Sequence, residues 1–196
     1  MWASGASTPE TVRFAAMDLD RVETERLVCC RPLARDAEEL HPVVADPRVA
    51  DWLWPGHLGG ARTLSQVRTM LVHDMDHWKR HRFGPWLVRD RATREMLGRV
   101  GLERTHVGGE DEVEVAWLIA ADHWGSGLAT EAARAALDAA FGPLELPSVV
   151  AFTLHDNAGS RAVMDRLGMV YERDIEHAGL PHVLYRLPRP NTLHTW

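Results

Sequence analysis

The segment AWLIAADHWGSGLATEAARAA (116–136) constrains the fold most, because a strand, a loop with two glycines and a helix follow directly on each other. Gly125 and Gly127 can adopt backbone conformations closed to other residues, which lets consecutive N–H groups form one concavity. The positive end of the helix dipole lies behind these donors, so the segment predicts a phosphate or pyrophosphate site. A plain turn is the structural alternative. No Lys-Ser/Thr follows the glycines and a third glycine is missing, so this is neither a P-loop nor a Rossmann loop.

The remaining hydrophobic pattern predicts an α+β fold: a mixed, mostly antiparallel twisted sheet with one parallel strand pair and flanking helices. We expect strands at 25–33, 86–90, 95–105, 112–120, 148–154, 170–176 and 182–187, and helices at 34–45, 63–80, 127–142 and 158–167. This order contains one βαβ crossover. It requires strands 112–120 and 148–154 to be parallel neighbours.

Length and composition indicate one globular domain of 196 residues, of which 45% are hydrophobic. We expect a flexible arm at 1–22, the folded domain at 23–188 and a tail at 189–196. The net charge of −6 argues against nucleic-acid binding through phosphate neutralisation. No run of 18 apolar residues and no signal peptide are visible, so we expect no membrane partner and a cytoplasmic protein. The adjacent Cys29 and Cys30 point to opposite faces of a strand, which excludes a disulfide framework.

Four motifs together resemble those of the GNAT N-acetyltransferase superfamily. The segment 124–129 fills that family's pyrophosphate signature, Gln/Arg-x-x-Gly-x-Gly/Ala, with Trp124 in place of Gln or Arg. Together with 129–132 (Ala-Thr-Glu-Ala), it is similar to the branch of the ribosomal-protein N-terminal acetyltransferases. Further matches are 23–27 (Glu-Thr-Glu-Arg-Leu), Asp156-Asn157-x-x-Ser160-Arg161, and 167–169 (Leu-Gly-Met).

The resemblance implies a GNAT-like sheet whose parallel strand pair is splayed. It also implies acetyl-CoA as co-substrate and no metal. It implies that pantetheine pairs with the strand backbone, as an added strand would, and that pyrophosphate is held by the loop amides. The implied cofactor-binding residues are Trp117, Leu118, Ile119, Trp124, Gly125, Ser126, Gly127, Leu128, Ala129, Thr130, Asn157, Ser160 and Arg161. For Asn157, a helix N-cap is the structural alternative.

Amine acetylation needs a base for the ammonium and an acid for the departing thiolate. Strand alternation places Glu114 and Glu112 on the face opposite Val113, Val115 and Trp117, and Glu114, close to the splay, is our candidate base. A solvated carboxylate is its alternative, and His155 or a water chain are rival bases. Many family members have a thiolate-protonating Tyr seven residues after the Asn, where this chain has Met164. We therefore expect Ser160, or water, to donate the proton.

Two other groups of residues were considered as binding sites. Trp52 and Trp54 lie in the Pro- and Gly-rich stretch DWLWPGHLGG and predict either an aromatic substrate wall or a hydrophobic staple for that loop. His73, His77 and His81 share a helix face, but no carboxylate or cysteine pattern completes a metal site.

The sequence thus predicts an acetyl-CoA-dependent N-acetyltransferase acting on a small-molecule or peptide primary amine by direct transfer in a ternary complex. The alternative is a non-catalytic acyl-CoA-binding sensor on the same fold, which the missing Tyr and the unusual Trp124 would suit. Neither the acceptor nor the length of the acyl group can be read from the residues. Exposed Trp residues and the sheet edge permit a homodimer.

Overall fold

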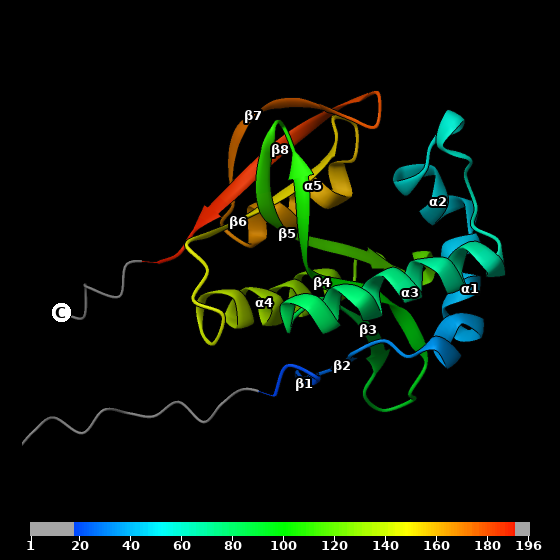
Figure 1. Ribbon diagram of the computed structural model, residues 1–196. Coiled ribbons are helices and arrows are strands. Elements are labelled where there is room, and N and C mark those ends of the chain that lie inside the picture. Colours follow the sequence, from blue (N-terminus) through cyan, green and yellow to red (C-terminus); the bar gives the residue numbers. More distant parts are fainter. Residues whose placement is uncertain (1–17, 191–196) are drawn as a thin grey trace, which may run out of the picture.

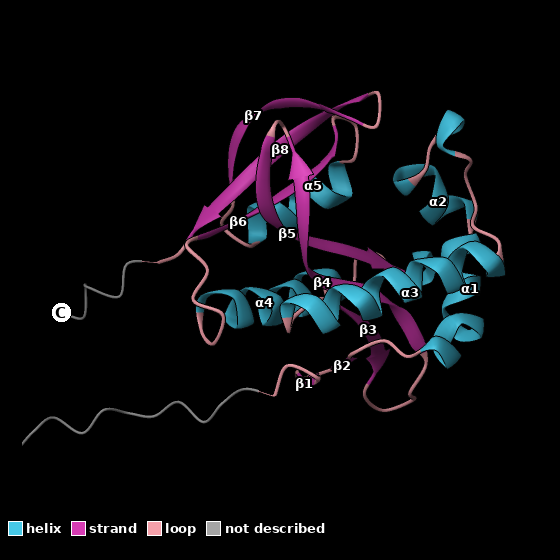
Figure 2. Ribbon diagram, in the orientation of Figure 1, coloured by secondary structure: helices cyan, strands magenta, loops and turns pink. Residues whose placement is uncertain are grey.

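An eight-stranded sheet runs through the protein in the order β1-β2-β3-β4-β5-β6-β8-β7. The structure is a computed structural model that describes residues 18–190. Figures 1 and 2 show the sheet with its helices. The elements are β1 (Arg21–Glu23), β2 (Leu27–Cys30), η1 (Ala34–Asp36), α1 (Ala37–Ala45), α2 (Pro47–Leu53), η2 (Gly56–Leu58), α3 (Leu64–His81), β3 (Pro85–Asp90), β4 (Met96–Val107), β5 (Glu110–Ile119), η3 (Ala121–His123), α4 (Leu128–Phe141), β6 (Ser148–Leu154), α5 (Ala158–Arg166), β7 (Val170–His177) and β8 (Leu180–Pro188).

The strands pair antiparallel except for β5 and β6, which are parallel neighbours as predicted. Their ladder has a single register pair, Glu114 with Val150. Beyond that pair, β5 continues along β4 as far as Ile119, while β6 continues along β8 as far as Leu154. The two strands therefore separate towards their carboxyl ends. The predicted α+β fold with a splayed parallel pair is confirmed.

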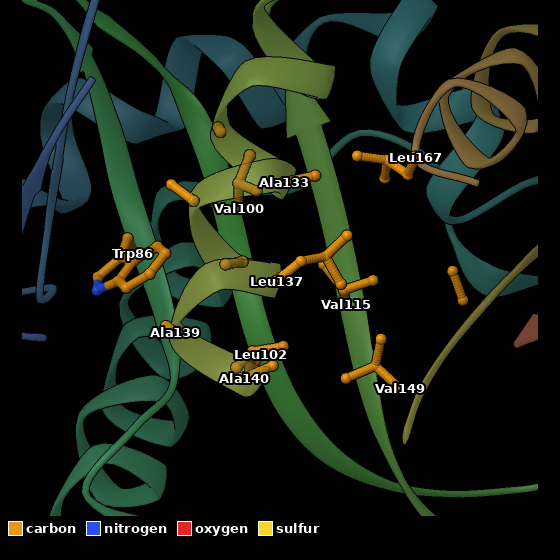
Figure 3. Packing of buried hydrophobic residues seen from close by; sticks show 14 of the residues in the cluster. Trp86, Val100, Leu102, Val115, Ala133, Leu137, Ala139, Ala140, Val149 and Leu167 are labelled. Carbon is orange, nitrogen blue, oxygen red and sulfur yellow. The ribbon is translucent and has the colours of Figure 1, made fainter. Parts of the chain in front are cut away.

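Helix α4 packs closely on the sheet because its inner face is almost entirely alanine. Ala132, Ala133, Ala136 and Ala140 have no exposed surface. Figure 3 shows Ala133 and Ala140 of α4 over the strands that carry Leu102 and Val115. Small side chains let the helix axis approach the strands, so the helix N-terminus stays beside the end of β5. Helix α5 contributes Val163, Met164 and Leu167 to the same core.

Helices α1 and α3 build a second core around Leu87 and Leu118 of the sheet. Helix α3 begins with a capping box, in which the Thr63 side chain accepts from the Gln66 N–H and the Gln66 side chain accepts from the Thr63 N–H. Its stripe of Val67, Leu71 and Trp78 is buried, as the helical spacing predicts. These helices place polar residues of α3 above β4 and β5.

The sequence reading missed two elements at the start of the chain. Strand β1 includes Arg21 and Val22, so the arm expected at 1–22 is wrong at its end; residues 1–17 of that arm lie outside the described part of the chain. Helix α2 follows Asp46-Pro47, where only the end of the preceding helix was predicted. Pro47 occupies its first turn and the Asp46 side chain accepts from the Arg48 N–H, so the dipeptide also starts a helix. The tail residues 191–196 are likewise not described.

Within residues 18–190, no helix combines the length and apolarity needed to cross a bilayer.

Candidate active site

The loop between β5 and α4 exposes unpaired backbone donors at a helix N-terminus. Gly125 and Gly127 have φ of +75° and +84°, a left-handed conformation that side chains rarely adopt. Gly127 is the N-cap, so no side chain caps the first turn of α4. A Cβ built on Gly125 meets nothing within 4 Å. Open space and uncapped backbone N–H groups therefore coincide at the positive end of the α4 dipole, which suits a phosphate group.

Side chains hold the backbone of this loop from both sides. The Trp124 indole N–H donates to the carbonyl of Ile119 at 2.7 Å, and the Ser126 hydroxyl donates to the carbonyl of His123. The Arg26 guanidinium donates to the carbonyl of Ser126 at 2.9 Å. Trp124 thus closes the loop back onto the end of β5, while about half of its surface remains exposed.

Glu131 connects α4 to the turn between β1 and β2. Its carboxylate accepts from the Thr24 hydroxyl, the Arg26 N–H at 2.8 Å and the Arg26 side chain at 2.7 Å. Burial raises the pKa of Glu131, but the hydrogen bonds from Thr24 and Arg26 outweigh it and hold the pKa below the usual range. Two of the four sequence motifs therefore meet in space. Arg26 is a part of the site that the sequence reading did not assign.

Thr130 carries an unused polar atom in the first turn of α4. The side chain is buried, and its Oγ1 has no hydrogen-bond partner among residues 18–190. With Gly127, Arg26 and Arg134 it lines a surface hollow of about 570 Å³ along α4. A buried hydroxyl without a partner costs stability unless a ligand or water completes it. This loop and helix start therefore fit a phosphate-bearing ligand such as acetyl-CoA.

The splay leaves one backbone edge of β5 without a β6 partner in the stretch Trp117–Ile119, where the Trp124 indole already occupies the carbonyl of Ile119. These residues pair with β4 on one side, and their ladder with β6 has ended at Glu114. Leu118 and Ile119 are buried, so they offer backbone groups and not side chains to a ligand. An extended arm with amides can add to such an edge.

Glu114 occupies the point where β5 and β6 part. Desolvation by burial, followed by the charge of Glu103, raises the pKa of Glu114 to about 8, although Arg99 opposes the rise. The Glu114 carboxyl is therefore half ionised near pH 8. The neighbouring Glu112 is different, because Arg186 of β8 binds both of its oxygens, at 2.6 and 3.2 Å. Glu114 is therefore suited to exchange a proton, while Glu112 on the same strand face holds β5 to β8.

The N-terminus of α5 carries Asn157, Ser160 and Arg161. The Asn157 side-chain oxygen accepts from the Ser160 N–H at 3.0 Å, so Asn157 is the N-cap and still has its amide NH₂ to offer. Among the described residues, the Ser160 hydroxyl has no hydrogen-bond partner. Arg161 is exposed and donates to the carbonyl of His155 at 3.3 Å. Met164 is fully buried in the core and contributes packing only.

His155, the rival base, faces a different part of the sheet. Its Nε2 lies 3.3 Å from the carboxylate of Asp174 on β7. Cys29 is buried, and burial raises the pKa of its thiol to about 12. A thiol with such a pKa stays protonated and is a poor nucleophile.

The two tryptophans of the α2 segment have different surroundings. The Arg62 guanidinium lies 4.2 Å above the ring of Trp54, which also packs against the core of α1 and α3. Trp54 therefore packs as a hydrophobic staple for this segment, which is one of the two alternatives given by the sequence. Trp52 is 38% exposed on α2. The segment also contacts the β7–β8 turn through His57, whose Nε2 lies 3.1 Å from the carbonyl of Ala178.

The central histidine of the α3 row, His77, has structural hydrogen-bond partners. The Arg104 N–H donates to Nε2 of His77 at 2.9 Å, so its Nδ1 carries the proton and donates to the carbonyl of Phe83. Both nitrogens of the central histidine are therefore occupied. A search of residues 18–190 for three or more potential ligands in one place finds no such group.

Comparison with known proteins identifies the family. The model of the acetyltransferase (GNAT) domain matches residues 26–170. The uncharacterized protein YkkB of Bacillus subtilis (strain 168) is 28% identical over 129 residues, covering 66% of this chain and 75% of YkkB. A solved acetyltransferase from Agrobacterium tumefaciens strain C58 is 26% identical with a TM-score of 0.72, covering 92% of this chain and 99% of that one.

A more distant structural neighbour is a ribosomal-protein acetyltransferase. The ribosomal L7/L12 alpha-N-protein acetyltransferase RimL, solved in complex with coenzyme A, has a TM-score of 0.64 at 16% identity, covering 84% of this chain and 95% of that one. At this identity the likeness shows the fold alone. Fold, family match and homologues together define an acetyl-CoA-dependent acyltransferase. The chain belongs to the GNAT acetyltransferase family, as its motifs predicted.

Proposed function

We propose that this enzyme transfers the acetyl group of acetyl-CoA directly to a primary amine held in the same complex. The observation that carries the proposal is the position of Glu114 at the point where β5 and β6 separate, with a pKa of about 8. A carboxylate poised near neutral pH suits a general base better than one with an ordinary pKa.

The binding of acetyl-CoA is assigned mainly to backbone groups. The edge of 117–119 that lacks a β6 partner pairs with the pantetheine arm, and the amides of 125–130 hold the pyrophosphate. Among residues 18–190, the Asn157 amide NH₂ has no partner and can contribute to binding. When bound, acetyl-CoA supplies an acetyl group activated as a thioester.

Glu114 accepts the proton that the acceptor amine must lose. The acceptor arrives as an ammonium ion, and its nitrogen can form a bond to the thioester carbon only after deprotonation. The proton passes to the Glu114 carboxylate, directly or through one water. The carbonyl–sulfur bond then breaks and the electron pair leaves with sulfur. We assign the proton for that sulfur to the Ser160 hydroxyl, which regains it from solvent.

Direct transfer is supported by the state of the cysteine in β2. A route through an acetylated cysteine needs a thiolate. The Cys29 thiol has a pKa of about 12 because it is buried, so it supplies almost none at neutral pH. The chain therefore offers a base for a ternary complex, and Cys29 is not an activated thiol.

The acceptor side is assigned to the α2 segment. Trp52 is exposed there, while Trp54 is engaged by Arg62, so Trp52 is the tryptophan that can contact a substrate. A small-molecule amine or a peptide N-terminus both suit this open segment.

The proposal is tested by amine-dependent release of free thiol from acetyl-CoA, measured over a panel of amines for the wild type, Glu114→Gln and Glu110→Gln. Glu110 is an exposed carboxylate on the same strand face, which makes it the matched control. We expect Glu110→Gln to match the wild type, and Glu114→Gln to lower kcat by about 100-fold with unchanged acetyl-CoA affinity. Acetyl-CoA binding without thiol release from any amine would favour the sensor function instead.

A further inference from the structure

Three carboxylates and one guanidinium form a connected cluster around the candidate base. They are Glu114 on β5, Glu103 and Arg99 on β4, and Asp74 on α3. Glu103 and Glu114 are directly opposite partners in the antiparallel ladder of β4 and β5. Opposite residues of such a ladder have their Cβ atoms about 5 Å apart on the same face. Two like charges in this position repel each other.

Arg99 is committed chiefly to Asp74. Its Nε donates to one Asp74 oxygen at 2.7 Å and its Nη2 to the other at 2.6 Å, in a bidentate pair. Asp74 is 1% exposed, so water does not compete for this pair. The same Nη2 also donates to Glu103 at 2.9 Å, which gives Glu103 only one bond from a shared nitrogen. One positive charge thus serves two carboxylates and leaves the third without a cation.

The other charged groups on this face are already matched. Glu112 precedes Glu114 by two residues on β5 and is paired with Arg186 of β8. His77 of α3 accepts a backbone N–H at Nε2 and is therefore neutral. The β6 partner at the end of the ladder is the apolar Val150. The neighbouring charges that affect the ionisation of Glu114 are therefore those of Glu103 and Arg99, and Asp74 is the ion-pair partner of Arg99.

We propose that the Glu103 carboxylate acts on Glu114 as a like charge that makes Glu114 retain its proton, and that Asp74 is the positioning residue that makes this so by engaging Arg99. This inference rests on the proposed function, since it concerns the base of the same reaction. Without Asp74, the whole guanidinium charge of Arg99 would be available to the two glutamates, and Glu114 would lose its proton at lower pH. With Asp74 engaging Arg99, the negative charge of Glu103 opposes ionisation of Glu114 more strongly, so Glu114 keeps its proton to higher pH.

This arrangement predicts the direction in which each of three substitutions shifts the pKa of Glu114. Glu103→Gln removes the neighbouring negative charge, so Glu114 loses its proton at lower pH. Asp74→Asn leaves the charge of Arg99 uncompensated and shifts the titration in the same direction. Arg99→Gln removes the positive charge and shifts it to higher pH. Loosened packing alone would not give opposite signs for neighbouring members of one cluster.

The experiment is the pH profile of kcat/KM together with a carbon NMR titration of the Glu114 carboxyl, identified by the resonance missing in Glu114→Gln. We expect the acidic limb and the NMR midpoint to move down by about one pH unit in Glu103→Gln and Asp74→Asn. Arg99→Gln should move both upwards by a similar amount. Asp76→Asn makes the same change two residues along α3, at an exposed carboxylate paired with Arg80, and should move neither.

Two different results separate the possible failures. If Glu114→Gln keeps the wild-type acidic limb, Glu114 is not the base and the proposed function fails at that residue. If Glu114→Gln removes the limb but Glu103→Gln leaves the limb and the NMR midpoint unchanged, the base acts alone and this inference is overturned. Glu103 is about one-third exposed, so its variant remains informative even if Asp74→Asn does not fold.

Discussion

Glu131, in the first turn of α4, accepts hydrogen bonds from both the backbone N–H and the side chain of Arg26, at the turn between β1 and β2. Arg26 in turn donates to the carbonyl of Ser126 in the glycine loop. The first hairpin of the chain is thereby joined to the loop that begins α4, about a hundred residues later. The arrangement fixes the loop amides before a ligand arrives, which lowers the ordering cost of binding.

The first prediction concerns this connection. Glu131→Ala should lower the free energy of unfolding by about 1–2 kcal/mol, because it leaves the Arg26 N–H and the Thr24 hydroxyl without their acceptor. It should also weaken coenzyme A binding. Urea unfolding and calorimetric titration measure the two effects. Glu25→Ala, at the exposed residue beside Arg26, should change neither, and equal affinity of Glu131→Ala and wild type would show that the loop holds its shape alone.

The second prediction concerns Gly127, which has a φ of +84°. A Cβ there meets only the Arg26 guanidinium, at 3.6 Å, so Gly127→Ala is unfavourable through its backbone conformation and not through a clash. We expect a loss of about 1 kcal/mol of stability and at least tenfold weaker coenzyme A binding, since the amides turn away.

The matched control is Gly109→Ala in the β4–β5 turn. Gly109 has a φ of +87° and a Cβ on it meets nothing within 4 Å. The backbone cost should be the same, but coenzyme A affinity should be unchanged because this turn lies at the other end of β5. If both variants bind coenzyme A equally, the loop is not the pyrophosphate site.

The crossover and the alanine face of α4 could be predicted from the sequence, because both depend on local periodicity, whereas the splay was implied only by the family resemblance. Glu114 could be selected for the same reason, since strand alternation fixes its face. The Arg99–Asp74 pair could not be predicted. Its members lie 25 residues apart on a strand and a helix, and the apolar stripe of α3 gives no sign that Asp74 turns inward.

The α2 segment shows a second limit of the sequence. Asp46-Pro47 is a helix-ending signal for the residues before it and a helix-starting signal for those after it, and only the first meaning was used. The two tryptophans of the segment look equivalent in sequence. The contact with Arg62 that distinguishes Trp54 from Trp52 is visible only in the structure.

The third prediction concerns Ser160 as the proton donor to sulfur. Ser160→Ala should lower kcat about 10 to 100-fold with little change in the acetyl-CoA KM, since Met164 provides no alternative acid. Steady-state kinetics measure both constants. Ser65→Ala, an exposed serine in the first turn of α3, is the control. A change confined to KM would make the Ser160 hydroxyl a binding group only.

The last prediction uses the pKa of Glu114 as a probe of stability. Its pKa is about 8 in the folded protein against an ordinary value of 4.5. Below pH 4.5 the group is protonated in both states and contributes no difference. As the pH rises from about 4.5 to about 8, the unfolded chain ionises first, so this group increasingly favours unfolding, and above pH 8 the penalty is constant.

Glu114→Gln removes that penalty while it keeps the shape of the side chain. The variant should therefore be more stable than the wild type at pH 8, by on the order of 2 kcal/mol, and the difference should shrink towards zero near pH 4.5. Urea unfolding across this pH range measures it, with Glu110→Gln as the variant that should follow the wild type throughout. A pH-independent difference between Glu114→Gln and wild type would mean that Glu114 has an ordinary pKa, and the base would then have to be sought at His155 or in a water chain.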